Sequence, residues 1–110
     1  ALVDKVEYSY HPGVHPVYKK MCKIYAVRAR HYLHRNIGYV PGLITHAFHG
    51  RKALRKYNER WRILVDEQFN PELDLKMDSQ GLYQLTERNW RLRDKIRNYF
   101  RDRNEDSIEF

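Results

Sequence analysis

Two histidines and a basic pair stand close together in the middle of the chain, in the run Ile44-Thr45-His46-Ala47-Phe48-His49-Gly50-Arg51-Lys52. Imidazole nitrogen is a good ligand for divalent transition metals, and neighbouring cationic side chains suit a diphosphate. The pattern therefore offers His46 and His49 as metal ligands, and Arg51 and Lys52 as diphosphate contacts. Spacing alone favours two ordinary histidines, one packed and one solvated, and the two imidazoles converge only if the chain turns before His49.

Other residue types that do chemistry lack supporting neighbours. His31 and His34 lie one helical turn apart, but no carboxylate stands at a matching spacing, so a solvated helix face is expected. Cys22 falls within a predicted helix and is interpreted as a packing residue. Asp74 is expected in a turn or a hairpin. The chain contains neither an Asp-x-Asp motif nor a glycine-rich phosphate loop, so it lacks a complete catalytic set.

A helix is predicted from about Val17 to His34, because apolar residues recur there at helical spacing. The stripe consists of Val17, Met21, Ile24, Tyr25 and Tyr32. Arg28 falls within it, and an unpaired charge in a core is very costly. Either this arginine has a buried stem and a solvated head, or the face meets a ligand or another chain segment. A glycine stop at Gly38 is expected after the helix.

The motif histidines fall at the end of a predicted buried strand. Residues 43–48 are apolar and partly β-branched, and the strand would end at His49 and Gly50. A buried strand needs a hydrogen-bonding partner. That partner would be the first eight residues, a hairpin further along the chain, or a domain upstream of Ala1.

Two more helices and a hairpin complete the predicted fold. The second helix follows the motif, and its apolar stripe is Leu54, Tyr57, Trp61, Leu64 and Val65. Asn70 and Pro71 end it, two short extended pieces in residues 73–85 flank a turn at 78–81, and the last helix spans about 89–104. The sequence thus predicts a mainly helical α+β fold with about three helices, one buried strand and a hairpin. Residues 1–110 would form a single domain or the C-terminal part of a larger enzyme.

The chain is basic, and this favours anionic partners. It has 110 residues, with 21 Lys and Arg against 14 Asp and Glu, a formal net charge of +7 and a pI near 9.6. Arg93, Arg97 and Arg101 form a basic stripe on the last helix, which is either a footprint for nucleic acid or a solvated face. No apolar run is long enough to span a bilayer. A single cysteine excludes a disulfide framework and favours a reduced, intracellular setting.

Seven short segments, spread from about Tyr18 to the end of the chain, form a recognisable set. They are residues 35–42, 44–50, 55–57, 60–64, 69–71, 78–83 and 99–106. Together they resemble the C-terminal part of bacteriophage glycosyltransferase-like proteins. The resemblance implies a GT-A type of α/β fold, in which a divalent metal binds the diphosphate of a nucleotide-sugar and offsets the charge of the leaving group. That metal is usually manganese, held by an Asp-x-Asp and often by a histidine nearer the C-terminus.

The resemblance also assigns roles to the motif residues. His49 best matches the late metal-ligating histidine, for manganese or magnesium, and His46, Arg51 and Lys52 would support the diphosphate. The missing Asp-x-Asp and nucleotide-binding half imply the metal-closing, acceptor-side part of a longer enzyme in the cytoplasm of a bacterial host. Its partners would be a nucleotide-sugar, an unidentified acceptor and the upstream domain, and this chain alone would not transfer sugar.

Two other classes of function remain open. One is a small basic phage protein that binds nucleic acid through Arg93, Arg97 and Arg101, and the other is an interaction protein of the virion. A transferase fragment should bind nucleotide-sugar in a manner that depends on metal and on His49. A nucleic-acid module should instead show a steep salt dependence and ignore His49→Ala.

Overall fold

The computed structural model describes residue 2 and residues 5–46, 55–57 and 59–103. Their elements are, in chain order, η1 (Val6–Ser9), α1 (Pro16–Leu33), α2 (Arg60–Asp66), α3 (Pro71–Asp74), β1 (Leu75–Met77), β2 (Tyr83–Leu85), η3 (Glu87–Asn89) and α4 (Trp90–Asp102), where η marks a 3-10 helix. The described chain is therefore mainly helical with one antiparallel hairpin, which confirms the predicted α+β class.

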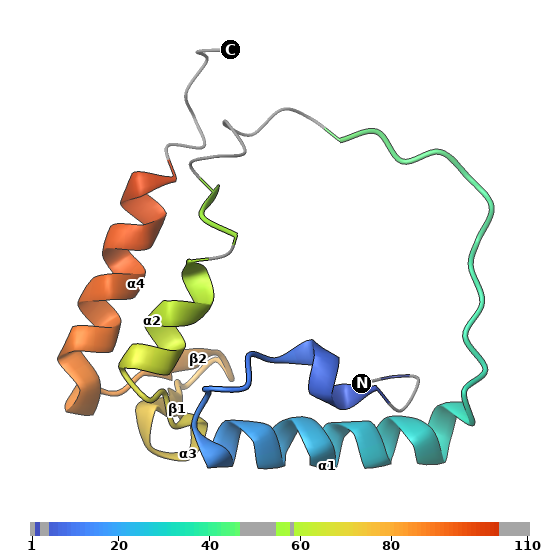
Figure 1. The fold of residues 1–110 in the computed structure, drawn as a ribbon, viewed down its shortest axis with the longest axis horizontal. Helices are drawn as coiled ribbons and strands as arrows, with labels where there is room; N and C mark the ends of the chain where they lie inside the picture. Colours follow the sequence, from blue (N-terminus) through green and yellow to red (C-terminus); the bar gives the residue numbers. More distant parts are fainter. Residues whose placement is uncertain (1, 3–4, 47–54, 58, 104–110) are drawn as a thin grey trace.

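Helices α2 and α4 lie side by side, and α1 runs across one end of this pair (Figure 1). Helix α3 and the hairpin fill the corner between them. Tyr18 of α1 joins the two parts, because its ring meets those of Trp61 and Phe69 edge-on, with centroids 6.4 and 6.1 Å apart. The hairpin pairs Leu75 with Leu85 across the strands.

The buried interior of the described chain is small. Leu92 of α4 is fully buried, and Val14, Ala26 and Ala29 are nearly so. The radius of gyration is 17.1 Å, whereas a compact chain of this length would have about 13 Å. The described chain is therefore open in shape, and many of its large apolar side chains are exposed.

A buried carboxylate fixes the corner. Asp74 is 1% exposed, and its Oδ2 accepts the main-chain N–H of Asn70 at 2.8 Å. Its Oδ1 accepts a hydrogen bond from the Nε–H of Arg88 at 3.0 Å and forms an ion pair with Nη2 of the same side chain at 2.8 Å. Because Asn70 also caps α3 by accepting the N–H of Glu72, this network ties the start of α3 to η3. The sequence-based assignment of Asp74 to a turn misses this role.

Helix α1 begins as the sequence predicts but ends differently. Pro16 occupies its first turn, and the His15 side chain caps it by accepting the N–H of Val17. At the other end, the predicted glycine stop at Gly38 is wrong. The helix ends at His34, whose φ of 47° is left-handed, and Arg35 follows with a φ of 62°. The N–H of His34 still bonds to the carbonyl of Arg30, so the end is closed without glycine.

The predicted apolar stripe of α1 is not a core face. Met21 and Ile24 are each 45% exposed, and Tyr25 and Tyr32 are exposed more. The residues that α1 buries are Ala26 and Ala29, which allow η1 to pack closely along the helix. Periodicity identified the apolar positions correctly, but the described chain covers them only in part.

The second helix is shorter than predicted. It begins at Arg60, and residues 55–57 are not α-helical, since Lys56 has a left-handed φ of 46°. Residue 54, the start of the predicted stripe, lies outside the described residues. Of the other stripe members, Trp61 is half-buried against Tyr18, whereas Tyr57 is 42% exposed and is not core as predicted.

Residues 36–46, here called the arm, leave the end of α1 in an extended path away from the helices (Figure 1). Its large apolar side chains are strongly exposed, with Tyr39, Val40, Leu43 and Ile44 at 88–93%. The buried strand predicted over 43–48 is therefore wrong for residues 43–46, and residues 47 and 48 lie outside the described part. The physical reason is that the described strands β1 and β2 pair with each other and not with the arm, so residues 43–46 have no strand partner in the described chain.

Candidate functional site

The predicted site residues lie just beyond the arm. His46 is its last described residue and is exposed. His49, Arg51 and Lys52 lie outside the described residues, so their predicted convergence stays a prediction. The segment that contains them is joined on one side to the arm and on the other to Arg55.

Residues 55–57 are anchored to the C-terminal half of α4. The hydroxyl of Tyr99 donates to the carbonyl of Arg55 at 3.2 Å, and Lys56 forms an ion pair of 2.6 Å with Asp102. Arg55 in turn donates from Nη1 to the Tyr57 hydroxyl at 3.1 Å. The chain that leaves the histidine motif is thus held by a packed helix, which is how a rigid scaffold positions a functional loop.

Three arginines surround the phenol of Tyr57. Arg60 stacks over its ring at 5.0 Å from the centroid, and Arg103 lies over the neighbouring Tyr99 ring at 5.5 Å. The hydrogen bond from Arg55 lowers the pKa of the Tyr57 hydroxyl below its usual value, and the charges of Arg55, Arg60 and Arg103 add to this effect. A lowered phenol pKa indicates a positive potential, so this Tyr57 cluster favours anions.

The sequence pattern does not reveal the Tyr57 cluster, because helical spacing places Tyr57 in an apolar stripe. The signal was the run Arg55-Lys56-Tyr57 with Arg60 three residues later. In a continuous helix Tyr57 would share a face with Trp61. Lys56 instead has a left-handed φ, which is not α-helical. The Tyr57 side chain therefore does not lie on the face of Trp61 and is found beside the arginines.

The arginine stripe of α4 is present but is mixed with carboxylates. Arg97 and Arg101 are exposed, while Arg93 bonds to Asp94 at 3.1 Å. Lys95 on the same helix pairs with Glu67 at 2.5 Å. Charge is thus partly compensated along α4, which weakens this stripe as a footprint for nucleic acid.

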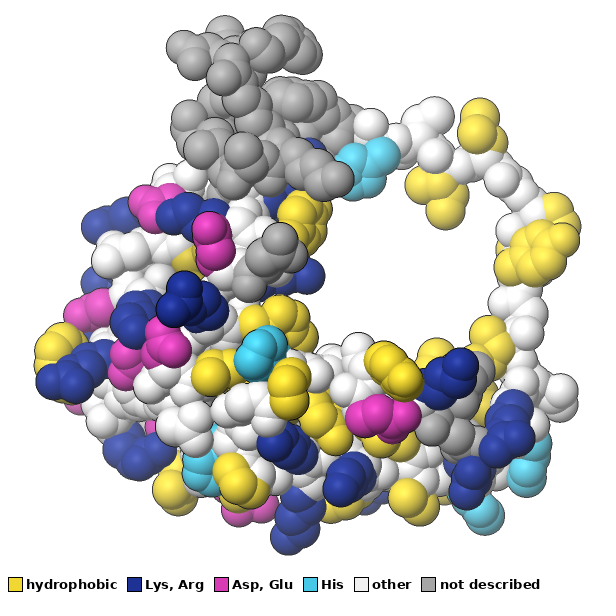
Figure 2. All heavy atoms as spheres, in the orientation of Figure 1, with side chains coloured by type: hydrophobic (Ala, Val, Ile, Leu, Met, Phe, Trp, Pro, Cys, Tyr) yellow, Lys and Arg dark blue, Asp and Glu magenta, His cyan; other side chains and the backbone are white. Residues whose placement is uncertain are grey.

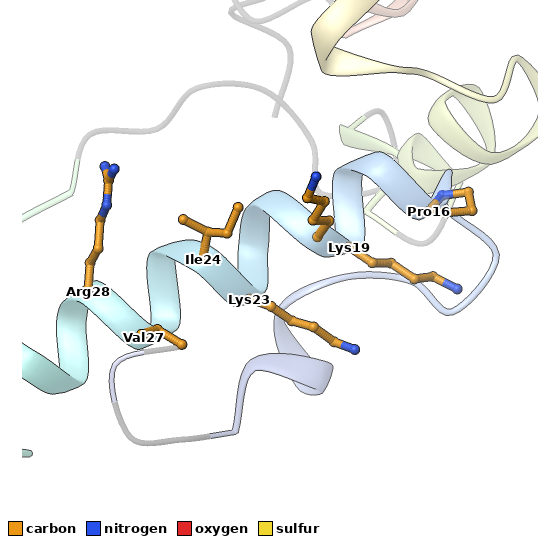
Figure 3. Close-up of a pocket in the computed structure, with 7 residues that line it drawn as sticks. Pro16, Lys19, Lys23, Ile24, Val27 and Arg28 are labelled. Atoms are coloured by element: carbon orange, nitrogen blue, oxygen red, sulfur yellow. The ribbon is translucent and has the colours of Figure 1, made fainter.

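Helix α1 has a different electrostatic character. A shallow groove of about 680 Å³ follows its outer face, lined by Pro16, Lys19, Lys20, Lys23, Ile24, Val27 and Arg28 (Figure 3). Basic side chains gather along α1 in Figure 2, whereas acidic ones lie mainly over α2 and α4. The sequence signal for this face, which was overlooked, is that residues 8–58 contain no Asp or Glu but ten Lys or Arg.

The remaining chemical groups have structural roles or stay unassigned. His11 accepts the N–H of Gly13 through Nδ1, and His15 caps α1 by accepting the N–H of Val17, so both imidazoles take part in local backbone hydrogen bonds. Burial raises the pKa of the Cys22 thiol, which does not favour a nucleophile.

Within the described ranges, no three His, Cys, Asp or Glu side chains lie close enough together to hold a metal ion. No helix in those ranges is long and apolar enough to cross a membrane.

Comparison with known proteins gives no relative: no family model, no curated protein and no solved structure matches this chain.

Proposed function

We propose that this chain is the C-terminal, metal-closing portion of a phage-type glycosyltransferase that uses a nucleotide-sugar donor. The observation that supports this best is the exposed arm. In the proposal, the arm lies as a strand against the upstream part of the same enzyme and presents the histidine motif at the end of that strand.

The arm is extended like a β-strand, but it has no neighbouring strand among the described residues. Between residues 38 and 45, no main-chain hydrogen bond reaches another described residue. Tyr39, Val40, Leu43 and Ile44 are almost wholly exposed, although burial of each such side chain is worth about 1.5–3 kcal/mol. Soluble proteins rarely expose contiguous apolar surface of this kind unless it meets a partner. An edge strand upstream would satisfy both the backbone and the side chains.

Pairing of the arm with an upstream strand would also position the residues that are proposed to bind the metal and the diphosphate. His46 ends the arm, so it and His49 would arrive together at the end of a strand in a rigid sheet, where ligating side chains are commonly placed. His49 would hold manganese or magnesium, and the bound metal would neutralise charge on the leaving diphosphate. Arg51 and Lys52 would contact the diphosphate oxygens, and the Tyr57 cluster would extend the positive surface.

The first test is calorimetric titration of the chain with manganese, and then with uridine and guanosine diphosphate sugars. Nucleotide binding should require the metal and should weaken by at least about tenfold in His49→Ala. His31→Ala is the control, because His31 is exposed on α1 and has no role in the proposal. Equal binding by both variants would contradict the assignment of His49.

A second test separates the arm from the metal site. In this chain, the amides of residues 38–45 should exchange hydrogen at nearly the rate of an unfolded peptide. In a longer protein that includes the upstream part, the same amides should be protected by at least about tenfold. Unchanged exchange rates would exclude the proposed strand pairing, whatever the metal titration shows.

A further inference from the structure

We propose that the outer face of α1 is a binding surface for the phosphate backbone of a nucleic acid. This basic face is defined by the residues of its groove: Pro16, Lys19, Lys20, Lys23, Ile24, Val27 and Arg28. The proposal requires neither the histidine motif nor the upstream part of an enzyme, so it stands apart from the proposed transferase.

The cations of this face are available to a ligand. Lys20, Lys23 and Arg28 are exposed, and none of them forms an ion pair with a described carboxylate. Figure 3 shows Lys19, Lys23 and Arg28 extending from α1, with Ile24 and Val27 between Lys23 and Arg28. Three of the four ion pairs described above involve α4, and none of the four involves Lys20, Lys23 or Arg28 of α1.

The spacing of these cations suits a phosphate chain. Lys20 and Arg28 are two turns apart, which is about 12 Å along the helix axis. One strand of B-form DNA places a phosphate about every 3.4 Å along its axis, so this span faces about three to four phosphates. The sequence from residue 8 to residue 58 contains ten Lys or Arg and no carboxylate, and a basic segment of this kind attracts polyanions.

The same face does not fit a membrane surface. A helix that lies in a bilayer interface separates a broad apolar face from its lysines. On α1, Ile24 and Val27 lie between Lys23 and Arg28 within a single groove, so the apolar and charged groups are interleaved. A hydrated phosphate backbone accepts both kinds of side chain.

Arg28 gains an explanation from this proposal. Its position in an apolar stripe has two interpretations. Either the side chain has a buried stem and a solvated head, or this face of the helix contacts another molecule. Arg28 is exposed, and its neighbours Ile24 and Val27 are 45% and 69% exposed, so the face is not a core face. The second interpretation therefore fits, with nucleic acid as the molecule that it contacts.

The experiment measures fluorescence anisotropy of labelled 20-nucleotide single strands and duplexes at several salt concentrations. The test variant is Lys20→Gln with Lys23→Gln and Arg28→Gln. The control is Arg91→Gln with Arg97→Gln and Arg101→Gln, which removes the same charge from exposed positions of α4. Circular dichroism should report an unchanged fold for both variants, because all six side chains lie on the surface.

The α1 variant should bind single strands about 10- to 100-fold more weakly at 50 mM salt, and its salt slope should fall by about 2. The α4 variant should retain most of the affinity and slope, and His49→Ala should bind like the unaltered chain. Equal losses in both triple variants would overturn the proposal, since net charge alone would then explain binding. Binding to vesicles of phosphatidylserine and phosphatidylcholine, but not to either nucleic acid, would overturn it in favour of a membrane surface.

Discussion

Removal of the buried carboxylate of Asp74 should be among the most damaging single changes to the described fold. In Asp74→Ala, the N–H of Asn70 loses its acceptor while it remains buried, at a cost of about 1–3 kcal/mol. The lost ion pair with Arg88 adds only about 0.5–1 kcal/mol, because that side chain is 52% exposed and its guanidinium is rehydrated. The expected destabilisation is therefore about 1.5–4 kcal/mol.

The assay is urea denaturation followed by far-ultraviolet circular dichroism at 25 °C. With a denaturant slope of about 1.5 kcal/mol per molar, a loss of 3 kcal/mol lowers the midpoint by about 2 M. Asp74→Asn keeps the volume but turns an amide N–H₂ toward a donor, so it should recover less than half of the loss. Arg97→Met is the matched surface control, since Arg97 is exposed, and it should change stability by less than about 0.5 kcal/mol.

A double-mutant cycle then isolates the coupling of Asp74 with Arg88. Arg88→Met leaves the carboxylate buried without its counter-charge, so this change should itself cost about 1–3 kcal/mol. The double variant should be more stable than the sum of the two losses predicts, by at least about 1 kcal/mol. Additive losses, or an Asp74→Ala variant as stable as the Arg97→Met control, would refute the reasoning about the buried network.

Three further outcomes are expected. Gly81→Ala should destabilise the hairpin by about 1 kcal/mol in urea denaturation, because the φ of Gly81 is 78°, whereas Gly38→Ala should be neutral since a Cβ there meets nothing within 4 Å. Leu92→Ala should cost about 2–5 kcal/mol in the same assay, because Leu92 is fully buried. Arg55→Met should raise the pKa of Tyr57 toward its usual value, as measured by NMR of ¹³C-labelled tyrosine. Because the fold lowers this pKa, the contribution of Tyr57 to stability is present at high pH and is lost as the pH falls through the folded pKa, and Arg55→Met should weaken that dependence, since Arg60 and Arg103 remain.

The elements that the sequence predicted well are those with strong local signals. Helix α1 has a proline in its first turn and helical spacing throughout, and the predicted bounds of α4 differ from the observed ones by one or two residues. The hairpin turn is equally local, because Asp78 accepts the N–H groups of Gln80 and Leu82 and Gly81 supplies the positive φ. Such interactions involve residues a few positions apart, so a single sequence reveals them.

The errors concern contacts between distant residues. The spacing of Met21 and Tyr25 shows which side of α1 is apolar, but not whether any element covers that side. The partner of Asp74 is Arg88, 14 residues away, and no local pattern links them. The strand expected over residues 43–48 depended on a neighbouring strand, which periodicity alone does not supply. The histidine site remains a prediction from type and spacing.

The long connection between α1 and α2 has a consequence for chain entropy. Twenty-six residues separate Leu33 from Arg60, yet Tyr18 must pack against Trp61 for the two parts to join. Closure of a loop costs about (3/2)RT ln n, which for 26 residues is about 2.9 kcal/mol apart from a constant. Residues 55–57 offset part of this cost through their bonds to α4, whereas residues 38–45 make no main-chain hydrogen bond to another described residue. The arm therefore adds to the entropic cost of folding of the isolated chain. This is expected of a segment whose function is to contact another molecule.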